Sequence, residues 1–213
     1  MGVRAYNVEN PFGVLRMNNC CRLSNVTKEY LYAFQEILDL MIQGMTEAEL
    51  TDSISHNFIV QMIPHHRAAI EMSHNILNYT TNIPLQDIAL QIISEQTKSI
   101  EDMERIVCGC SALQNTGKEL SGYQCRMEEI MRTMFDAMGS ACVVNDVNVD
   151  FMRQMIPHHL GAVRMSELTL KYCICRELVP ILTAIITSQK RGIMQMQRLL
   201  RCMGCCLLYT SPS

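Results

Sequence analysis

Two adjacent histidines follow a proline at two places in the chain, each time within the same longer motif. The segment Phe58-Ile-Val-Gln-Met-Ile-Pro-His-His66 recurs 93 residues later as Phe151-Met-Arg-Gln-Met-Ile-Pro-His-His159. Imidazole nitrogen suits copper, zinc, nickel and iron, whereas the thioether of methionine selects copper(I) and its heavier relative silver. Histidine pairs with methionines beside them therefore indicate a site for a soft metal ion.

The apolar residues around each histidine pair have helical spacing. They advance by alternate steps of four and three residues, which keeps them on one face of a helix. Met62 precedes His65 by about one turn, Met72 follows it by about two turns, and Met103 lies on the next helix. The predicted metal ligands of the two copies are Met62, His65, His66, Met72, Met103, Met155, His158, His159, Met165 and Met196.

Each of these features also has a purely structural interpretation. Methionines at helical spacing commonly fill a core, and a histidine on an apolar face commonly forms a hydrogen bond there. Two neighbouring imidazoles are harder to accommodate, because they need a metal, a carboxylate or water as partner. Gln96 and Gln189 are polar residues within apolar faces. We predict that they either fix the imidazole tautomers or hold the helices together.

Pro64 and Pro157 lie inside the helices that this spacing predicts. An interior proline removes one backbone hydrogen bond and crowds the preceding turn, which costs about 3 kcal/mol or more. We therefore predict a kink in both copies that aims the histidine rings. The alternative is that duplication copied a harmless kink.

The repeat organises most of the chain. Between 57–78 and 150–171, 11 of 22 aligned residues are identical without a gap. Strand patterns are almost absent, so we predict an all-α protein. Two helical hairpins packed about an approximate two-fold axis would form a four-helix bundle, with an additional crossover helix and an N-terminal helix. The predicted helical patterns lie at 27–45, 58–76, 89–107, 121–138, 151–169 and 182–200.

The boundaries follow from the repeat and from local signals. We predict one domain at 27–205, made of repeats 27–108 and 120–201, after an N-terminal extension at 1–26. The tail at 206–213 resembles translated sequencing adapter and is left out of the fold. Thr46-Glu-Ala-Glu49 fits a capping box, Asp150 is a predicted N-cap, and Asn82-Ile-Pro84 indicates a break followed by a new helix.

Composition limits the partners. The 213 residues carry a formal net charge of −3 and are 48 % hydrophobic, which predicts a globular protein that does not bind nucleic acid. No apolar stretch reaches the roughly 18 residues of a membrane span, and the start of the chain lacks a secretory signal. We therefore expect a cytoplasmic protein whose 11 cysteines are mainly reduced thiols, with homo-oligomerisation left open.

Other chemistries fit the sequence less well. A di-iron bundle needs Glu-x-x-His on two helices, and Glu71-Met-Ser-His74 has this spacing, but its counterpart is Arg164-Met-Ser-Glu167. The cysteine pairs lack the regular spacing of a zinc site. The sequence also contains no phosphate-binding loop and no nucleophile motif. We expect that the protein is not an enzyme.

The doubled motif, followed by Ala and Met and then by Gln and Met on the next helix, resembles a bacterial family called domain of unknown function 305. The resemblance covers about 57–107 and 150–200. It implies a ferritin-like helical bundle and, in some members, copper binding in or near the periplasm through the His and Met residues of the motif. Many relatives carry an export signal or a membrane anchor. The family's usual acidic residue on the second helix is present as Glu101 and replaced by Met194 in the second copy, which predicts unequal sites.

Residues and resemblance together predict a copper(I)-binding protein for storage, buffering or tolerance, and silver would fit the same ligands. Two alternatives remain open. One is a structural or protein-interaction bundle without metal. The other is a thiol-dependent or metal-dependent redox protein.

Overall fold

The computed structural model describes residues 23–204, which form six α-helices. The predicted all-α class is confirmed, and no strand occurs in this part of the chain. None of the six helices is both long enough and apolar enough to cross a membrane. The helices are α1 (Asn25–Thr46), α2 (Ile54–Leu77), α3 (Ile83–Cys110), α4 (Gly117–Gly139), α5 (Val147–Thr169) and α6 (Leu178–Cys202).

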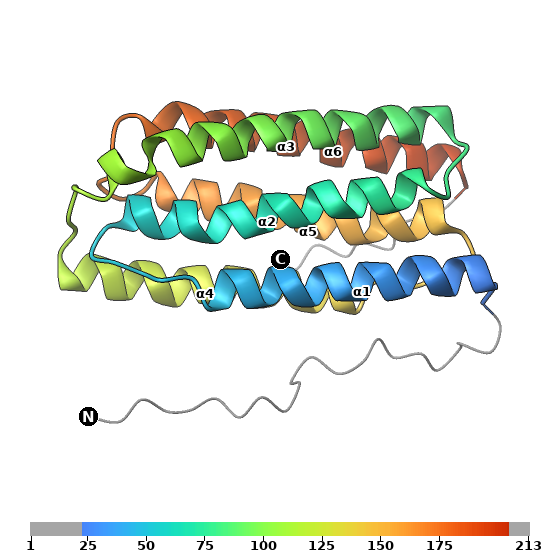
Figure 1. Ribbon diagram of the computed structural model, residues 1–213, viewed down its shortest axis with the longest axis horizontal. Helices are drawn as coiled ribbons and strands as arrows, with labels where there is room; N and C mark the ends of the chain where they lie inside the picture. Colours follow the sequence, from blue (N-terminus) through green and yellow to red (C-terminus); the bar gives the residue numbers. More distant parts are fainter. Residues whose placement is uncertain (1–22, 205–213) are drawn as a thin grey trace, which may run out of the picture.

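The helices lie in three layers of two (Figure 1). The middle layer consists of α2 and α5, with α3 and α6 on one side and α1 and α4 on the other. The four helices α2, α3, α5 and α6 contact one another as a four-helix bundle, and α1 and α4 cover its remaining side. Helices in the middle layer are covered on both sides, so polar residues on them are buried as well as apolar ones.

The two halves of the chain follow the same plan. Helix α2 packs between α1 and α3, and α5 packs between α4 and α6. The contacts between the halves join α2 to α5 and α3 to α6, which are equivalent helices. An approximate two-fold axis therefore passes between α2 and α5, next to the doubled motif.

The helix ends differ from the predictions at two of three places. Asn82 caps α3 with Pro in the first turn, as predicted. Thr46 instead ends α1, and Ser53 caps α2. Asp150 lies in the first turn of α5 and accepts a hydrogen bond from the Val144 backbone N–H, so the N-cap there is Asp146. The two errors have one cause, since short polar residues also occur in last and first turns. The capping box that forms joins Thr116 to Glu119.

Both prolines of the motif lie inside continuous helices. Helix α1 approaches α2 closely at Pro64, because a Cβ atom added to Gly44 would lie 2.8 Å from the Pro64 Cβ. Glycine is therefore the residue that allows this contact. The kink that we predicted at each proline stays a prediction.

The cysteines correct one expectation. Cys110 at the end of α3 and Cys175 just before α6 form a disulfide, although thiols were predicted. Hydrogen bonds hold both cysteines against the start of α2. The Ser53 hydroxyl donates to the Cys110 carbonyl oxygen, and the Ser55 hydroxyl accepts from the Cys175 backbone N–H. The pairing joins residues 65 positions apart, so only the tertiary fold brings them together. The free cysteines of the described chain are Cys108, Cys125, Cys142, Cys173 and Cys202.

We expect the double variant Cys110→Ser/Cys175→Ser to lose about 3 kcal/mol of its free energy of unfolding, because the bridge restricts the unfolded chain. Urea unfolding under non-reducing conditions measures this loss. The control is Cys108→Ser, which removes an exposed free thiol. Equal urea midpoints for the double variant and the control would contradict a stabilising bridge.

Candidate functional site

All four histidines of the doubled motif are buried. His65, His66 and His158 have no exposed surface, and His159 is 2 % exposed. They lie on α2 and α5, where these middle-layer helices contact each other and are covered by the outer layers. The motif therefore builds one cluster of four imidazoles in the centre of the protein, which we call the histidine cluster.

The inner pair of the cluster, His65 and His158, makes a reciprocal contact. The His65 Nε2 donates to the His158 carbonyl oxygen at 3.2 Å, and the His158 Nε2 donates to the His65 carbonyl oxygen at 3.1 Å. The ring centroids are 3.7 Å apart, with an angle of 30° between the ring planes. Because the two residues are 93 positions apart, the repeat distance, the two-fold axis passes between their rings.

These bonds fix the protonation of the inner pair. A carbonyl oxygen only accepts, so each Nε2 carries the proton of its neutral ring and each Nδ1 keeps a lone pair. Neither Nδ1 atom has a hydrogen-bond partner. The Nδ1 atoms of His66 and His159 are also buried without a partner. Buried nitrogens in this state are rare in proteins.

Burial also keeps the rings uncharged. Desolvation is the main cause in each case: it lowers the pKa of His66 to about 3 and that of His158 to about 4. The pKa values of His65 and His159 lie well below the usual range, through desolvation and then through the neighbouring imidazoles. At neutral pH the cluster is therefore a set of neutral nitrogen ligands.

The outer pair differs between the copies. The His66 Nε2 lies 3.1 Å from the Ser99 hydroxyl on α3, whereas the equivalent position on α6 is Gly192. Gln96 and Gln189 are buried, and the hydrogen bonds of the imidazoles go to backbone carbonyls and to Ser99 instead. The prediction that the glutamines fix the tautomers is therefore wrong. Ser99 was missed, although a comparison of positions 99 and 192 would have shown that the repeats differ there.

The predicted methionine ligands are all buried in the same core, with exposed fractions of 0 to 1 %. They come from the two motif helices and from the helices that cover them on one side. In the described chain, no three histidines have ring nitrogens that all lie within 4.8 Å of one another. A metal ion held by three or more ligands would therefore need thioether sulfur in addition to imidazole. The six predicted methionine ligands are Met62, Met72, Met103, Met155, Met165 and Met196.

Comparison with known families places the chain. The family described as domain of unknown function (DUF305) matches residues 55–200. The chain belongs to the DUF305 family. The match spans the segment from the first residues of α2 to the last turn of α6, and so includes the whole histidine cluster. No curated protein and no solved structure matches the chain.

One difference between the two DUF305 motif copies lies away from the cluster. Glu101 is exposed, and its counterpart Met194 is 61 % exposed. The exchange of an acidic residue for methionine therefore changes the outer surface. The contrast that touches the cluster is Ser99 against Gly192.

Proposed function

We propose that this protein binds copper(I) in the histidine cluster, with methionine sulfur as additional ligand, and serves copper storage, buffering or tolerance. The observation that carries the proposal is the set of four buried Nδ1 atoms without a hydrogen-bond partner. An unpartnered buried polar atom costs about 1–3 kcal/mol. A bound cation would give such lone pairs a partner.

The charge of the site favours a monovalent ion. Burying a charge is expensive unless other charges compensate it. The predicted ligands are neutral imidazoles and thioethers, so a single positive charge is easier to bury among them than a double one. Imidazole with thioether is also the ligand mixture that suits copper(I), and silver(I) would compete for it.

Burial supports storage over catalysis. The cluster is at most 2 % exposed, so only the edge of one imidazole can be reached and an organic substrate cannot lie among the four rings. A metal ion is small enough to be held there. We therefore propose binding without turnover.

A structural role is the second candidate, and the reciprocal His65–His158 contact favours it. Two hydrogen bonds across the axis join α2 to α5 and fix the register of the two repeats. In that case the imidazoles would be retained for specificity of packing. The two candidates differ in one respect, which is tight binding of copper(I).

Anaerobic copper(I) titration against a chromogenic chelator tests the proposal, with accessible thiols alkylated beforehand. We expect the variant with His65, His66, His158 and His159 all changed to Ala to bind copper(I) at least about a hundredfold more weakly. The matched control changes the two other histidines, His56→Ala/His74→Ala. Circular dichroism checks that both variants are folded. Equal affinities of the quadruple variant and the wild type would overturn the proposal.

The thioethers give a separate prediction. We expect Met62→Leu/Met155→Leu to weaken copper(I) binding by about tenfold while the urea midpoint changes little, because leucine and methionine have similar volumes. The control is Met45→Leu/Met138→Leu, an equivalent buried pair outside the predicted ligand set. The same titration compares the two variants. If both lose affinity equally, sulfur of Met62 and Met155 is not the ligand.

A further inference from the structure

The two copies expose their outer histidines differently. The Ser99 hydroxyl covers the His66 Nε2 at 3.1 Å. On the other half of the molecule, the His159 Nε2 makes no hydrogen bond to any described residue, and Gly192 replaces the serine. The exchange of a hydroxyl-bearing residue for glycine leaves this one imidazole edge uncovered.

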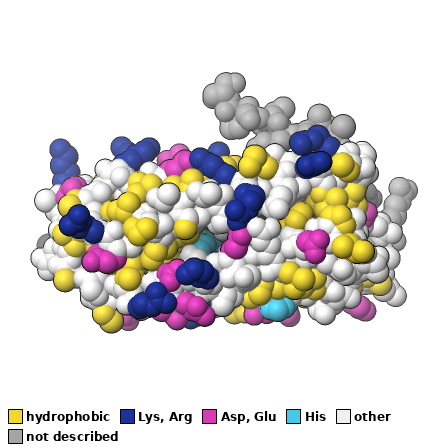
Figure 2. All heavy atoms as spheres, turned by 90° about the horizontal axis from the view of Figure 1, so that it is seen from above, with side chains coloured by type: hydrophobic (Ala, Val, Ile, Leu, Met, Phe, Trp, Pro, Cys, Tyr) yellow, Lys and Arg dark blue, Asp and Glu magenta, His cyan; other side chains and the backbone are white. Residues whose placement is uncertain are grey.

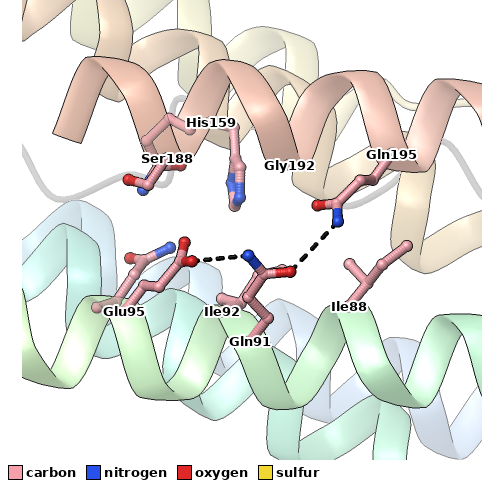
Figure 3. A pocket seen from close by; sticks show the side chains of 10 residues that line it. Ile88, Gln91, Ile92, Glu95, His159, Ser188, Gly192 and Gln195 are labelled. Atoms are coloured by element: carbon pink, nitrogen blue, oxygen red, sulfur yellow. Dashed lines mark hydrogen bonds between the residues drawn. The ribbon is translucent and has the colours of Figure 1, made fainter. Parts of the chain in front are cut away.

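A pocket lies over that edge, in the seam between α3 and α6. His159 lies in it, with Ile88, Gln91 and Glu95 on one wall and Gly192 and Gln195 on the other (Figure 3). A space-filling view of the same face shows histidine atoms at the base of a hollow (Figure 2). The pocket therefore leads from solvent to the histidine cluster.

The floor of the pocket is polar and incompletely paired. Gln96 and Gln189 line it, and each is 2 % exposed. Both side-chain amide atoms of Gln96, and the Oε1 of Gln189, have no hydrogen-bond partner. Buried amide oxygens beside an open imidazole edge can bind a cation transiently, because carbonyl oxygen is an acceptable though weak ligand.

Glycine is necessary for this arrangement. A Cβ atom at Gly192 would lie 2.9 Å from both the Cδ2 and the Nε2 of His159. Any other side chain would displace the ring or cover its Nε2 edge. Gly192 thus allows the ring to lie directly against the backbone of α6.

The mouth of the pocket holds the Glu95 carboxylate in a half-buried polar bridge. Gln195 on α6 donates to Gln91 on α3 at 3.3 Å, and Gln91 donates to Glu95 at 2.7 Å. Glu95 also pairs with Arg191 across the seam, with side chains 31 % and 44 % exposed. Exposed pairs contribute only about 0–1 kcal/mol, so this bridge can open readily. The position equivalent to Glu95 in the second repeat is Ser188, so this carboxylate occurs in one repeat only.

We propose that this pocket is the port through which copper(I) enters and leaves the histidine cluster, with the Glu95 carboxylate offsetting the Arg191 charge at the mouth and His159 as the first imidazole that the ion meets. The inference rests on the proposed function, because it assigns a route to the same site. It also makes the two copies unequal, since His66 is covered and His159 is reachable. The ion keeps its charge throughout and only exchanges ligands.

Stopped-flow transfer of copper(I) from a bicinchoninate complex tests the port. We expect Gly192→Ser, which installs the residue of the first copy, to slow uptake and release by the same factor, about tenfold. A blocked route lowers both rates together, whereas a damaged ligand changes Kd. Glu95→Gln leaves the Arg191 charge unpaired at the mouth and should therefore slow uptake, more strongly at low than at high salt. Unchanged rates in both variants, with copper(I) still bound, would overturn the port.

A metal-free measurement separates this inference from the proposed function. Diethyl pyrocarbonate modifies accessible neutral imidazoles, and peptide mass spectrometry locates the modification. We expect His159 to react about tenfold faster than His66 in the wild-type protein. Gly192→Ser should protect His159, and the matched variant Ser99→Gly should expose His66. Equal rates for His66 and His159 in the wild type would overturn the port. Absence of copper(I) uptake by the wild type would instead overturn the proposed function.

Discussion

We expect the metal-free protein to lose about 5 kcal/mol of its free energy of unfolding between pH 7 and pH 4.5 through His66 and His158 alone. Burial lowers the pKa of these two imidazoles to about 3 and about 4. In the unfolded chain they take up protons near pH 6.5. Below that pH the unfolded state binds more protons than the folded state, so stability falls as the pH falls.

The other titrating groups of the core modify this value in known directions. The pKa values of His65 and His159 are also well below the usual range, which adds to the loss. Burial raises the pKa of Asp150 to about 7, so its folded form binds a proton more readily than its unfolded form. Between pH 7 and pH 4.5 this opposes the loss by about 3 kcal/mol, which is less than the histidines lose together. The net direction is loss of stability in acid.

Urea unfolding at a series of pH values, followed by circular dichroism, measures this dependence. Because domains of this kind are stable by only about 5–15 kcal/mol, we expect unfolding in water to begin near pH 5. The variant His56→Ala/His74→Ala, which leaves the cluster intact, should show the same dependence as the wild type. A free energy of unfolding that stays constant from pH 7 to pH 4.5 would show that the cluster imidazoles are not held neutral.

The helices could be predicted from the sequence because their apolar residues recur with helical spacing. The 93-residue repeat also predicts that equivalent helices face each other, as α2 and α5 do. The burial of His65 and His158 follows from their place at the centre of the apolar face. The cap at Asp146 was harder to locate, because Asp150 is an equally good candidate within one turn.

The contacts inside the site depend on tertiary packing and could not be predicted. A helical pattern says which face is buried, but it does not say that His65 pairs with the backbone of its own counterpart. The Cys110–Cys175 bridge joins residues outside the repeated motif that only the fold brings together. Ser99 and Gly192 look unimportant until α3 and α6 are placed over the outer histidines.

The inner histidine pair allows the metal and the structural roles to be separated in one variant. We expect His65→Leu/His158→Leu to fold at neutral pH at least as stably as the wild type. Leucine fills the space, and the two carbonyl oxygens still accept the backbone hydrogen bonds of their helices. The change removes two buried imidazoles with unpartnered Nδ1 atoms, and replacing such polar groups by apolar ones is often neutral or stabilising.

Copper(I) and acid should change the stability of this variant, relative to the wild type, in opposite directions. The variant should be the more stable protein in acid without metal, and it should gain less stability from copper(I). Without metal at pH 4.5 it should be more stable by at least about 2 kcal/mol, since His158 alone accounts for that much of the acid loss. With free copper(I) at about 100 times the wild-type Kd, the wild type should gain about 2.7 kcal/mol at neutral pH, whereas a variant that binds a hundredfold more weakly should gain only about 0.4 kcal/mol. Urea unfolding under anaerobic conditions measures both stability differences, with His74→Leu at an exposed position as control.

A variant that unfolds more easily than the wild type at neutral pH would favour the structural role, because the reciprocal hydrogen bonds would then outweigh the unpartnered nitrogens. A variant that copper(I) stabilises as much as the wild type would exclude the Nδ1 atoms of the inner pair as ligands.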